Sequence, residues 1–259
     1  MHDRVHRAPS TLPGDTPLVE DRLFDLQLKF NLLPALYAHP SWIDRLTVDA
    51  LGSPAPSLKP VVWRPVSAFA TRRLSVRLLD AHGINGLVDF DFSDRGKRLA
   101  LLGGEQLVEV AALTSAVVLR DRLRTLVRAE QVAHLQRTMG APVHGFALRW
   151  QGQGGPELPP AVLEAVGSGL SPQAEPGRWR SGALRLLLSA IPPLALAVWR
   201  RLRLKLPSDW MAPLLPWRLR ETQRLALADL ATEVVRQALP GHAWLLADAA
   251  LETTHRTLS

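Results

Sequence analysis

Residues 105–139 read EQLVEVAALTSAVVLRDRLRTLVRAEQVAHLQRTM, and this stretch decides the fold class. One apolar stripe recurs at helical spacing and consists of Leu119, Leu123, Leu126 and Val127. A second stripe falls on nearly the opposite side of a straight helix and consists of Val132, Leu135 and Met139. The segment is therefore either one helix sandwiched between neighbours or a helix that breaks near residues 128–131. Both alternatives predict a helical core, which Gly140 ends.

Helical periodicity continues through the second half of the chain. The predicted helices cover residues 178–191, 194–204, 218–239 and 242–257. Ser208 suits the N-cap of a further short helix before Pro213. The helix at 218–239 carries the apolar stripe Ala226, Leu227, Leu230, Ala231 and Val234. The second half is therefore predicted to be helical throughout.

The beginning of the chain is less periodic. Residues 23–30 fit a short helix and a strand equally well. Pro34 and Pro40 each suit the first turn of a helix. The helix from Pro40 is expected to reach about Leu51, with Trp42, Ile43 and Leu46 facing inward. Four prolines within residues 52–66 predict a loop.

A strand-like period of two occurs once, where Val88, Phe90 and Phe92 alternate with Asp89 and Asp91. A small hairpin or an extended arm packed on helices would fit. The sequence therefore predicts a compact, mainly α protein with at most a small β element near residues 87–92. Four parts are expected: a disordered tail at 1–20, a helical core at 21–150, a Gly/Pro-rich linker or loop at 151–177, and an Arg/Trp-rich helical half at 178–259, packed on the core.

Composition excludes several classes of protein. The chain has no cysteine, so a disulfide scaffold, a thiolate metal site and a Cys nucleophile are excluded. The longest apolar run covers residues 186–199 and contains Pro192 and Pro193. It is shorter than the ~20 residues that a membrane span needs, which favours two helices meeting at a proline corner. A surface-lying or re-entrant membrane segment is the alternative.

No catalytic motif is present. The eight histidines are scattered, and no phosphate-binding or metalloprotease spacing occurs, so neither an enzyme nor a cofactor or metal site is predicted. Asp89, Asp91 and Asp94 lie close enough in sequence to suggest Ca²⁺ or Mg²⁺. The glycine and distal glutamate of an ion-binding loop are not in place, which favours the solvated side of a strand. Gly103-Gly104 is interpreted as a turn before a helix.

Positive charge is concentrated in residues 176–225. Ten Arg/Lys and two acidic residues give this window +8, which leaves −1 for the rest of a chain whose net charge is +7. Tryptophans interleave with the arginines, so the window fits a protein interface, a nucleic-acid or lipid surface, or a core covered by arginine stems. The candidate partner-binding residues in the window are Arg178, Arg180, Arg200, Arg201, Arg203, Lys205, Trp210, Arg218 and Arg220.

The segment FNLLPALYAHPSW, residues 30–42, resembles a signature of the SctK family (YscK, PscK, OrgA and MxiK) of bacterial type III secretion. Its specific part is Tyr37, His39, Pro40, Ser41 and Trp42. Two further landmarks follow in the family's order. They are Asp91-Phe92 before the run RLALL at 98–102, and Gly140 before the run FAL at 146–148. The resemblance covers roughly residues 21–150.

The resemblance implies a non-enzymatic adaptor in the sorting platform below the injectisome. Such a protein would link the cytoplasmic domain of the inner-membrane ring protein SctD to the pod protein SctQ, and indirectly serve SctL and the SctN ATPase. It would be cytoplasmic, peripheral at the inner membrane, without cofactor or small-molecule substrate. The alternative from the residues is a protein that binds nucleic acid or anionic membrane surfaces, with nucleic acid the less favoured partner. Tyr37 and His39 fit partner contacts and a local structural role equally well.

Overall fold

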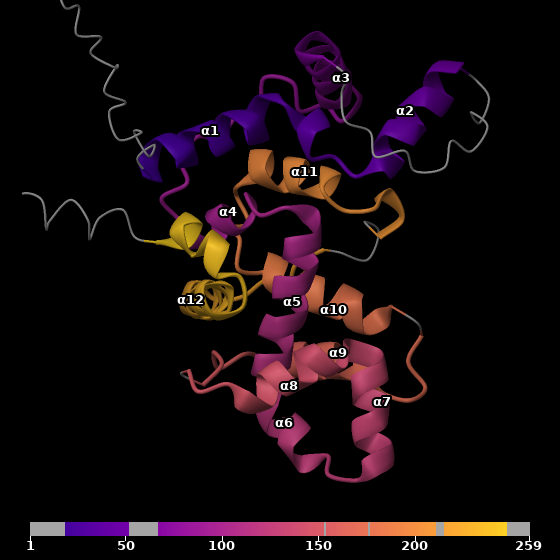
Figure 1. Ribbon diagram of the computed structural model, residues 1–259, viewed down its shortest axis with the longest axis vertical. Helices are drawn as coiled ribbons and strands as arrows, with labels where there is room; N and C mark the ends of the chain where they lie inside the picture. The colour runs from indigo at the N-terminus through magenta and orange to yellow at the C-terminus, as the bar shows by residue number, and fades with distance from the viewer. Residues whose placement is uncertain (1–18, 52–66, 153, 176, 211–214, 248–259) are drawn as a thin grey trace, which may run out of the picture.

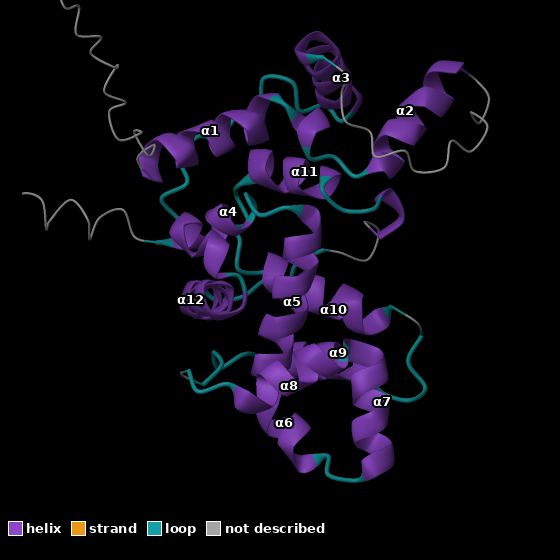
Figure 2. Ribbon diagram, viewed as in Figure 1, coloured by secondary structure: helices purple, strands orange, loops and turns teal. Residues whose placement is uncertain are grey.

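The computed structural model describes residues 19–51, 67–152, 154–175, 177–210 and 215–247, without the side chains of residues 19–20 and 47–51 (Figure 1). Within these ranges the chain forms helices joined by loops and contains no strand (Figure 2). The predicted mainly α class is confirmed. Of the tail expected at 1–20, residues 1–18 lie outside the described residues, and residues 19–20 belong to a helix instead. The proline-rich loop at 52–66 also lies outside the description.

The first half begins with α1 (Val19–Leu32), the 3-10 helix η1 (Pro34–Leu36), α2 (Pro40–Leu51), α3 (Ala68–Ala81) and α4 (Arg95–Leu99). Pro34 and Pro40 both start helices as predicted, and the ambiguous residues 23–30 are helical. Trp42 and Ile43 are buried and Leu46 is half-buried. The inward face predicted for α2 is therefore confirmed.

Residues 105–139 form three helices, α5 (Gly104–Val118), α6 (Arg120–Thr125) and α7 (Ala129–Met139), before α8 (Ala141–Arg149). The chain leaves helical geometry at 126–128, so the broken alternative describes it and the straight helix is wrong. The break precedes the predicted position at 128–131, since residues 129–131 already belong to α7. Val127 is 79% exposed because it lies in this break rather than on the apolar stripe. Helices α8, α10 and α12 pack against α5, which is central.

The second half contains α9 (Pro160–Gly167), η2 (Ser168–Leu170), α10 (Arg178–Leu188), α11 (Leu196–Leu204), η3 (Ser208–Trp210), α12 (Glu221–Ala238) and η4 (Pro240–Leu246). The prolines at 192–193 lie in the turn between α10 and α11, as predicted. Among the described residues no helix is long and apolar enough to cross a membrane. The last helix, predicted at 242–257, is not an α-helix in its described part, which belongs to the 3-10 helix η4. Residues 248–259 lie outside the described residues.

Two hydrophobic clusters hold the helices together. The larger takes residues from α1 to η4, and the Gly/Pro-rich segment contributes Leu158, Val162, Val166 and Leu170 to it. The smaller cluster consists of Ala35, Trp42, Leu78, Leu79, Ile84 and Leu204. It joins η1, α2 and α3 to α11, so the N-terminal helices are attached to the second half of the chain.

The extended residues 87–92 lie along α1 without forming a strand. Asn31 replaces a strand partner: its Nδ2 donates to the carbonyl of Asp89 (2.7 Å), and the Asp89 amide donates to its Oδ1 (3.0 Å). Phe92 is buried and meets Phe30 edge-to-face at 5.9 Å, whereas Phe90 is 41% exposed. The extended arm is therefore present, and its alternation buries only one of the three apolar side chains.

Candidate functional site

The Tyr37–Trp42 segment lies against the C-terminal end of α11. A helix leaves its last carbonyls without partners inside the helix. The indole of Trp42 donates to the carbonyls of Leu206 (2.8 Å) and Arg203 (3.2 Å), and the His39 amide donates to that of Leu204 (2.6 Å). The segment thus caps a helix that begins more than 150 residues later.

The polar tips within this segment face inward. The Tyr37 hydroxyl donates to the carbonyl of Phe30 (2.7 Å), and the two rings stack at 5.6 Å. Burial raises the pKa of the Tyr37 hydroxyl above its usual value. His39 Nδ1 lies 2.9 Å from Ser41 Oγ, which accepts a hydrogen bond from the Ser208 amide (2.9 Å). The hydroxyl groups of Tyr37 and Ser41 therefore make their hydrogen bonds within this chain. His39 is half-buried.

Two of the candidate basic residues lie in the interior. Arg201 is 1% exposed and donates to the carbonyls of Asn31, Ala197 and Ile84. Lys205 is 5% exposed, and its Nζ donates to Ala100 and Leu102 carbonyls, both at 2.7 Å. Burial lowers the pKa of the Lys205 amine to about 7. Both side chains connect segments of this chain, so neither is offered to a partner.

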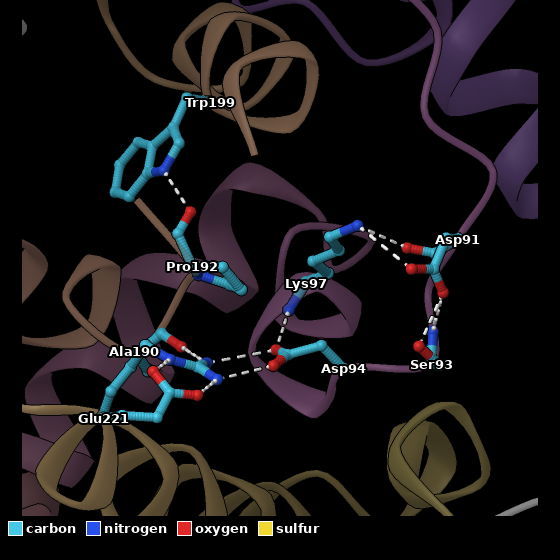
Figure 3. A network of polar contacts seen from close by, with 9 residues as sticks. Asp91, Ser93, Asp94, Lys97, Ala190, Pro192, Trp199 and Glu221 are labelled. Atoms are coloured by element: carbon cyan, nitrogen blue, oxygen red, sulfur yellow. Dashed lines mark hydrogen bonds and ion pairs between the residues drawn. The ribbon is translucent and has the colours of Figure 1, made fainter. Parts of the chain in front are cut away.

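Arg224, a third basic residue of the window, is also buried. Its guanidinium binds Asp94 (2.8 Å), Glu221 (2.6 Å) and the Ala190 carbonyl (2.9 Å), joining α12 to α4 and to the end of α10 (Figure 3). Its hydrogen bonds lower the pKa of Glu221, and the same bonds raise the pKa of Arg224. The sequence places Arg224 within the basic window and gives no sign of this network.

The three aspartates that suggested a cation site are held by basic side chains. Lys97 Nζ lies 2.9 Å from a carboxylate oxygen of Asp89. Figure 3 shows the same amine beside Asp91, at 3.7 Å. Asp94 caps α4 by accepting from the Lys97 amide and pairs with Arg224. Hydrogen bonds from Ser93 lower the pKa of Asp91. Within the described ranges no group of three or more His, Asp or Glu side chains is arranged to hold a metal ion.

Part of the basic window lines a groove of about 480 Å³ beside α10. Arg178, Arg180 and Arg185 line it together with Trp210 and Trp217. Two acidic residues, Glu175 and Asp209, also belong to the lining, so the arginines exceed the carboxylates by one. The Arg180 guanidinium lies 5.3 Å from the Trp210 ring centroid, and that of Arg185 lies 4.3 Å from Trp217. Arg218 and Arg220 are exposed further along the chain. The window thus splits into interior residues and a basic, aromatic surface.

A second basic pocket, of about 270 Å³, lies beside Trp42 and is lined by Trp42, His82, Arg200, Arg203 and Leu204. His82 meets the indole edge-to-face at 4.8 Å, and the guanidinium of Arg45 lies 5.6 Å from the ring centroid. Sequence reasoning missed Arg45 and His82. Arg45 follows Trp42 by one helical turn, which is a usable signal, but nothing in the local pattern connects His82 to α2.

A family model described as YOP proteins translocation protein K (YscK) matches residues 24–247. The match includes the Tyr37–Trp42 segment, the central helix α5 and the whole basic window. Comparison with curated proteins finds no match, and neither does comparison with solved structures. The family match extends well beyond the residues 21–150 covered by the sequence resemblance. The chain therefore belongs to the YscK family and is a type III secretion protein.

Proposed function

We propose that this chain is a non-enzymatic adaptor of the sorting platform that links the cytoplasmic domain of the inner-membrane ring protein SctD to the pod protein SctQ. It would lie at the cytoplasmic face of the inner membrane and serve SctL and the SctN ATPase indirectly. The family match over residues 24–247 carries this proposal. The helical fold with exposed basic and aromatic side chains supports it, because such residues commonly anchor protein interfaces.

The groove beside α10 is the proposed contact with one of these partners. Its two tryptophans are half-buried and its Arg178 and Arg180 are exposed. An arginine placed over an indole ring offers its donors to a carboxylate while the ring remains available for packing. An acidic surface of the partner would fit these residues, and opposite charges would speed association.

Co-purification tests the adaptor role. The full chain is mixed with the SctD cytoplasmic domain, with SctQ, and with both, and the complexes are separated by gel filtration. A stable complex with each partner and a ternary complex are expected. If the chain binds neither the SctD cytoplasmic domain nor SctQ, the adaptor role is ruled out.

Charge reversal tests the groove. Arg178→Glu combined with Arg180→Glu should reduce the association rate by roughly tenfold or more, since like charges replace opposite ones. The matched control is Arg149→Glu, at an exposed arginine of α8. Unchanged association of the double variant, measured by surface plasmon resonance, would place the contact elsewhere.

The alternative, binding of nucleic acid or anionic membranes, has less support from the placement of charge. Arg201, Lys205 and Arg224, three of the ten basic residues of the window, are buried. Phosphate-driven binding depends on the number of exposed cations and weakens steeply with salt. Binding of duplex DNA or phosphatidylglycerol vesicles at low salt, lost on adding salt, would favour this alternative over the adaptor.

A further inference from the structure

The pocket beside Trp42 brings together basic side chains from three segments that are distant in sequence, and its positive charge comes from the arginines of two of them. His82 follows α3, and Arg200 and Arg203 come from α11. Arg45 of α2 is not part of the lining but lies next to it, with its guanidinium 5.6 Å from the centroid of the Trp42 ring. The smaller hydrophobic cluster fixes these elements relative to one another, since Trp42, Leu78, Leu79 and Leu204 are all buried in it. The basic side chains are thus brought together by the fold.

This charge is not neutralised by the residues that the structure describes around the pocket. Among the described residues, none of those that line it is a carboxylate. Asp80, the nearest acid in sequence to His82, accepts from Asn85 instead (2.6 Å). Arg203 is exposed, and within the described chain its side chain has no ion pair. Arg200 donates to the Gly83 carbonyl through Nη1 (2.8 Å). A guanidinium has five N–H donors, so its other donors can reach a ligand.

The ends of α3 and α11 account for only part of the positive charge. A helix C-terminus carries about −0.5 charge, so two of them offset about one of the three arginines. The last carbonyls of α11 already accept from Trp42 and His39. The remaining positive potential acts on His82: burial lowers the pKa of its imidazole, and Arg203 and Arg45 lower it further.

We propose that this pocket binds a glutamate or aspartate side chain from an acidic segment of a partner protein. Guanidinium groups pair with carboxylates through parallel hydrogen bonds. Trp42 and Leu204, which are 6% and 1% exposed, give the pocket a small apolar wall that suits the methylene groups of a glutamate. A free phosphate or a lipid headgroup would use the arginines but not this wall. The inference rests on the proposed function only in taking the ligand to be part of a protein.

The imidazole of His82 reports on the pocket directly. The full chain, labelled with ¹⁵N-histidine, is titrated with a pentaglutamate peptide, with a pentaglutamine peptide of equal length, with inorganic phosphate and with phosphatidylglycerol vesicles. Pentaglutamate is expected to shift the His82 resonances and to raise the His82 pKa, because a bound carboxylate opposes Arg45 and Arg203. Pentaglutamine should leave both unchanged.

Variants separate this pocket from general attraction to a basic protein. Arg203→Gln should weaken pentaglutamate binding roughly tenfold, the value of one charge-assisted pair. Arg218→Gln, at an exposed arginine outside the pocket, should bind as the wild type does. Circular dichroism checks that both variants are folded. Equal loss in the two variants, or no shift of His82 with pentaglutamate, would overturn the proposal.

The remaining arms identify the source of the anion. Phosphate or vesicles that shift His82 more strongly than pentaglutamate would overturn the assignment to a protein carboxylate. The outcome is independent of the adaptor test. Co-purification with SctD and SctQ without any His82 response to pentaglutamate sinks this pocket and leaves the proposed function intact. A His82 response to pentaglutamate without co-purification supports this pocket and rules out the proposed function.

Discussion

The indole nitrogen of Trp42 donates to the carbonyl of Leu206, 164 residues further along the chain, at 2.8 Å. Trp42 is 6% exposed, and its ring belongs to the smaller hydrophobic cluster. Trp42, which belongs to the specific part of the family signature, therefore connects the N-terminal helices to α11. Its first role is structural, and only a small part of its ring remains accessible beside the neighbouring arginines.

Replacing Trp42 with Phe keeps an aromatic ring and removes the donor. We expect the free energy of unfolding to fall by about 1–3 kcal/mol, because two buried carbonyls lose their partner. Trp42→Ala should cost about 3–5 kcal/mol, since it also leaves a cavity. Urea denaturation followed by circular dichroism measures both, and an unchanged midpoint for Trp42→Phe would contradict the hydrogen bonds.

Gly96 in α4 has no room for a side chain, because a Cβ there would overlap the carbonyl oxygen of Ala190. Gly96→Ala would normally stabilise a helix by up to about 1 kcal/mol. Here it should instead destabilise by about 1–3 kcal/mol, because α4 and the end of α10 must move apart. The control is Gly145→Ala in α8, where the Cβ meets only the flexible end of Arg149. Thermal unfolding should show opposite signs for the two substitutions.

The Arg224 network predicts a large difference between two ion pairs on α12. Arg224→Met leaves Asp94 without its buried partner and should cost about 3 kcal/mol. Arg236→Met removes an exposed pair with Glu233 and should change stability by less than about 1 kcal/mol. Chemical denaturation of both variants provides the comparison, and similar losses would argue against the buried network.

Lys205 predicts a pH dependence of stability. Its pKa in the fold is about 7 because of burial, below the value of about 10.4 for an exposed lysine. Between these values the unfolded chain binds more protons, so the free energy of unfolding rises as the pH rises. From about pH 7 to about pH 9 the gain is on the order of 2 kcal/mol.

Lys205→Met removes the titrating group, so its stability should lack this rise. The difference between wild type and variant, measured by urea denaturation at several pH values, isolates Lys205 from other titrating groups. Above this range Tyr37 titrates, with a raised pKa, and opposes the trend. Parallel curves for the two proteins up to about pH 9 would show that the lysine is not buried as described.

Most of the helical order could be predicted from local pattern. Proline fixes its own φ and lacks an N–H donor, so it marks helix starts and corners in the sequence itself. This predicts the helices that begin at Pro34 and Pro40 and the proline corner at 192–193. The break at 126–128 could be predicted only as an alternative. Val127 continues an apolar stripe in sequence, and only the packing of α6 and α7 decides that it is exposed.

The interior basic residues were harder to predict, although one signal exists. Arg201 and Lys205 fall at helical spacing on the same face of α11 as the buried Val198 and Leu202. Charge favours a solvent-facing interpretation of such positions. The two side chains are buried instead because they donate to carbonyls 103 to 170 residues away in sequence. No local pattern predicts acceptors at such a separation. The same limit applies to Arg224 and Asp94, which are 130 residues apart.

The capping of α11 by Tyr37–Trp42 also constrains the order of events during synthesis. A ribosome adds about 5–20 residues per second, so Trp42 leaves the exit tunnel on the order of ten seconds before Leu206. Throughout that interval the indole lacks its two carbonyl acceptors, and the smaller hydrophobic cluster lacks Leu204. The N-terminal helices are therefore the first to be made and among the last to be completed, and an interrupted translation product would expose them to chaperones and proteases.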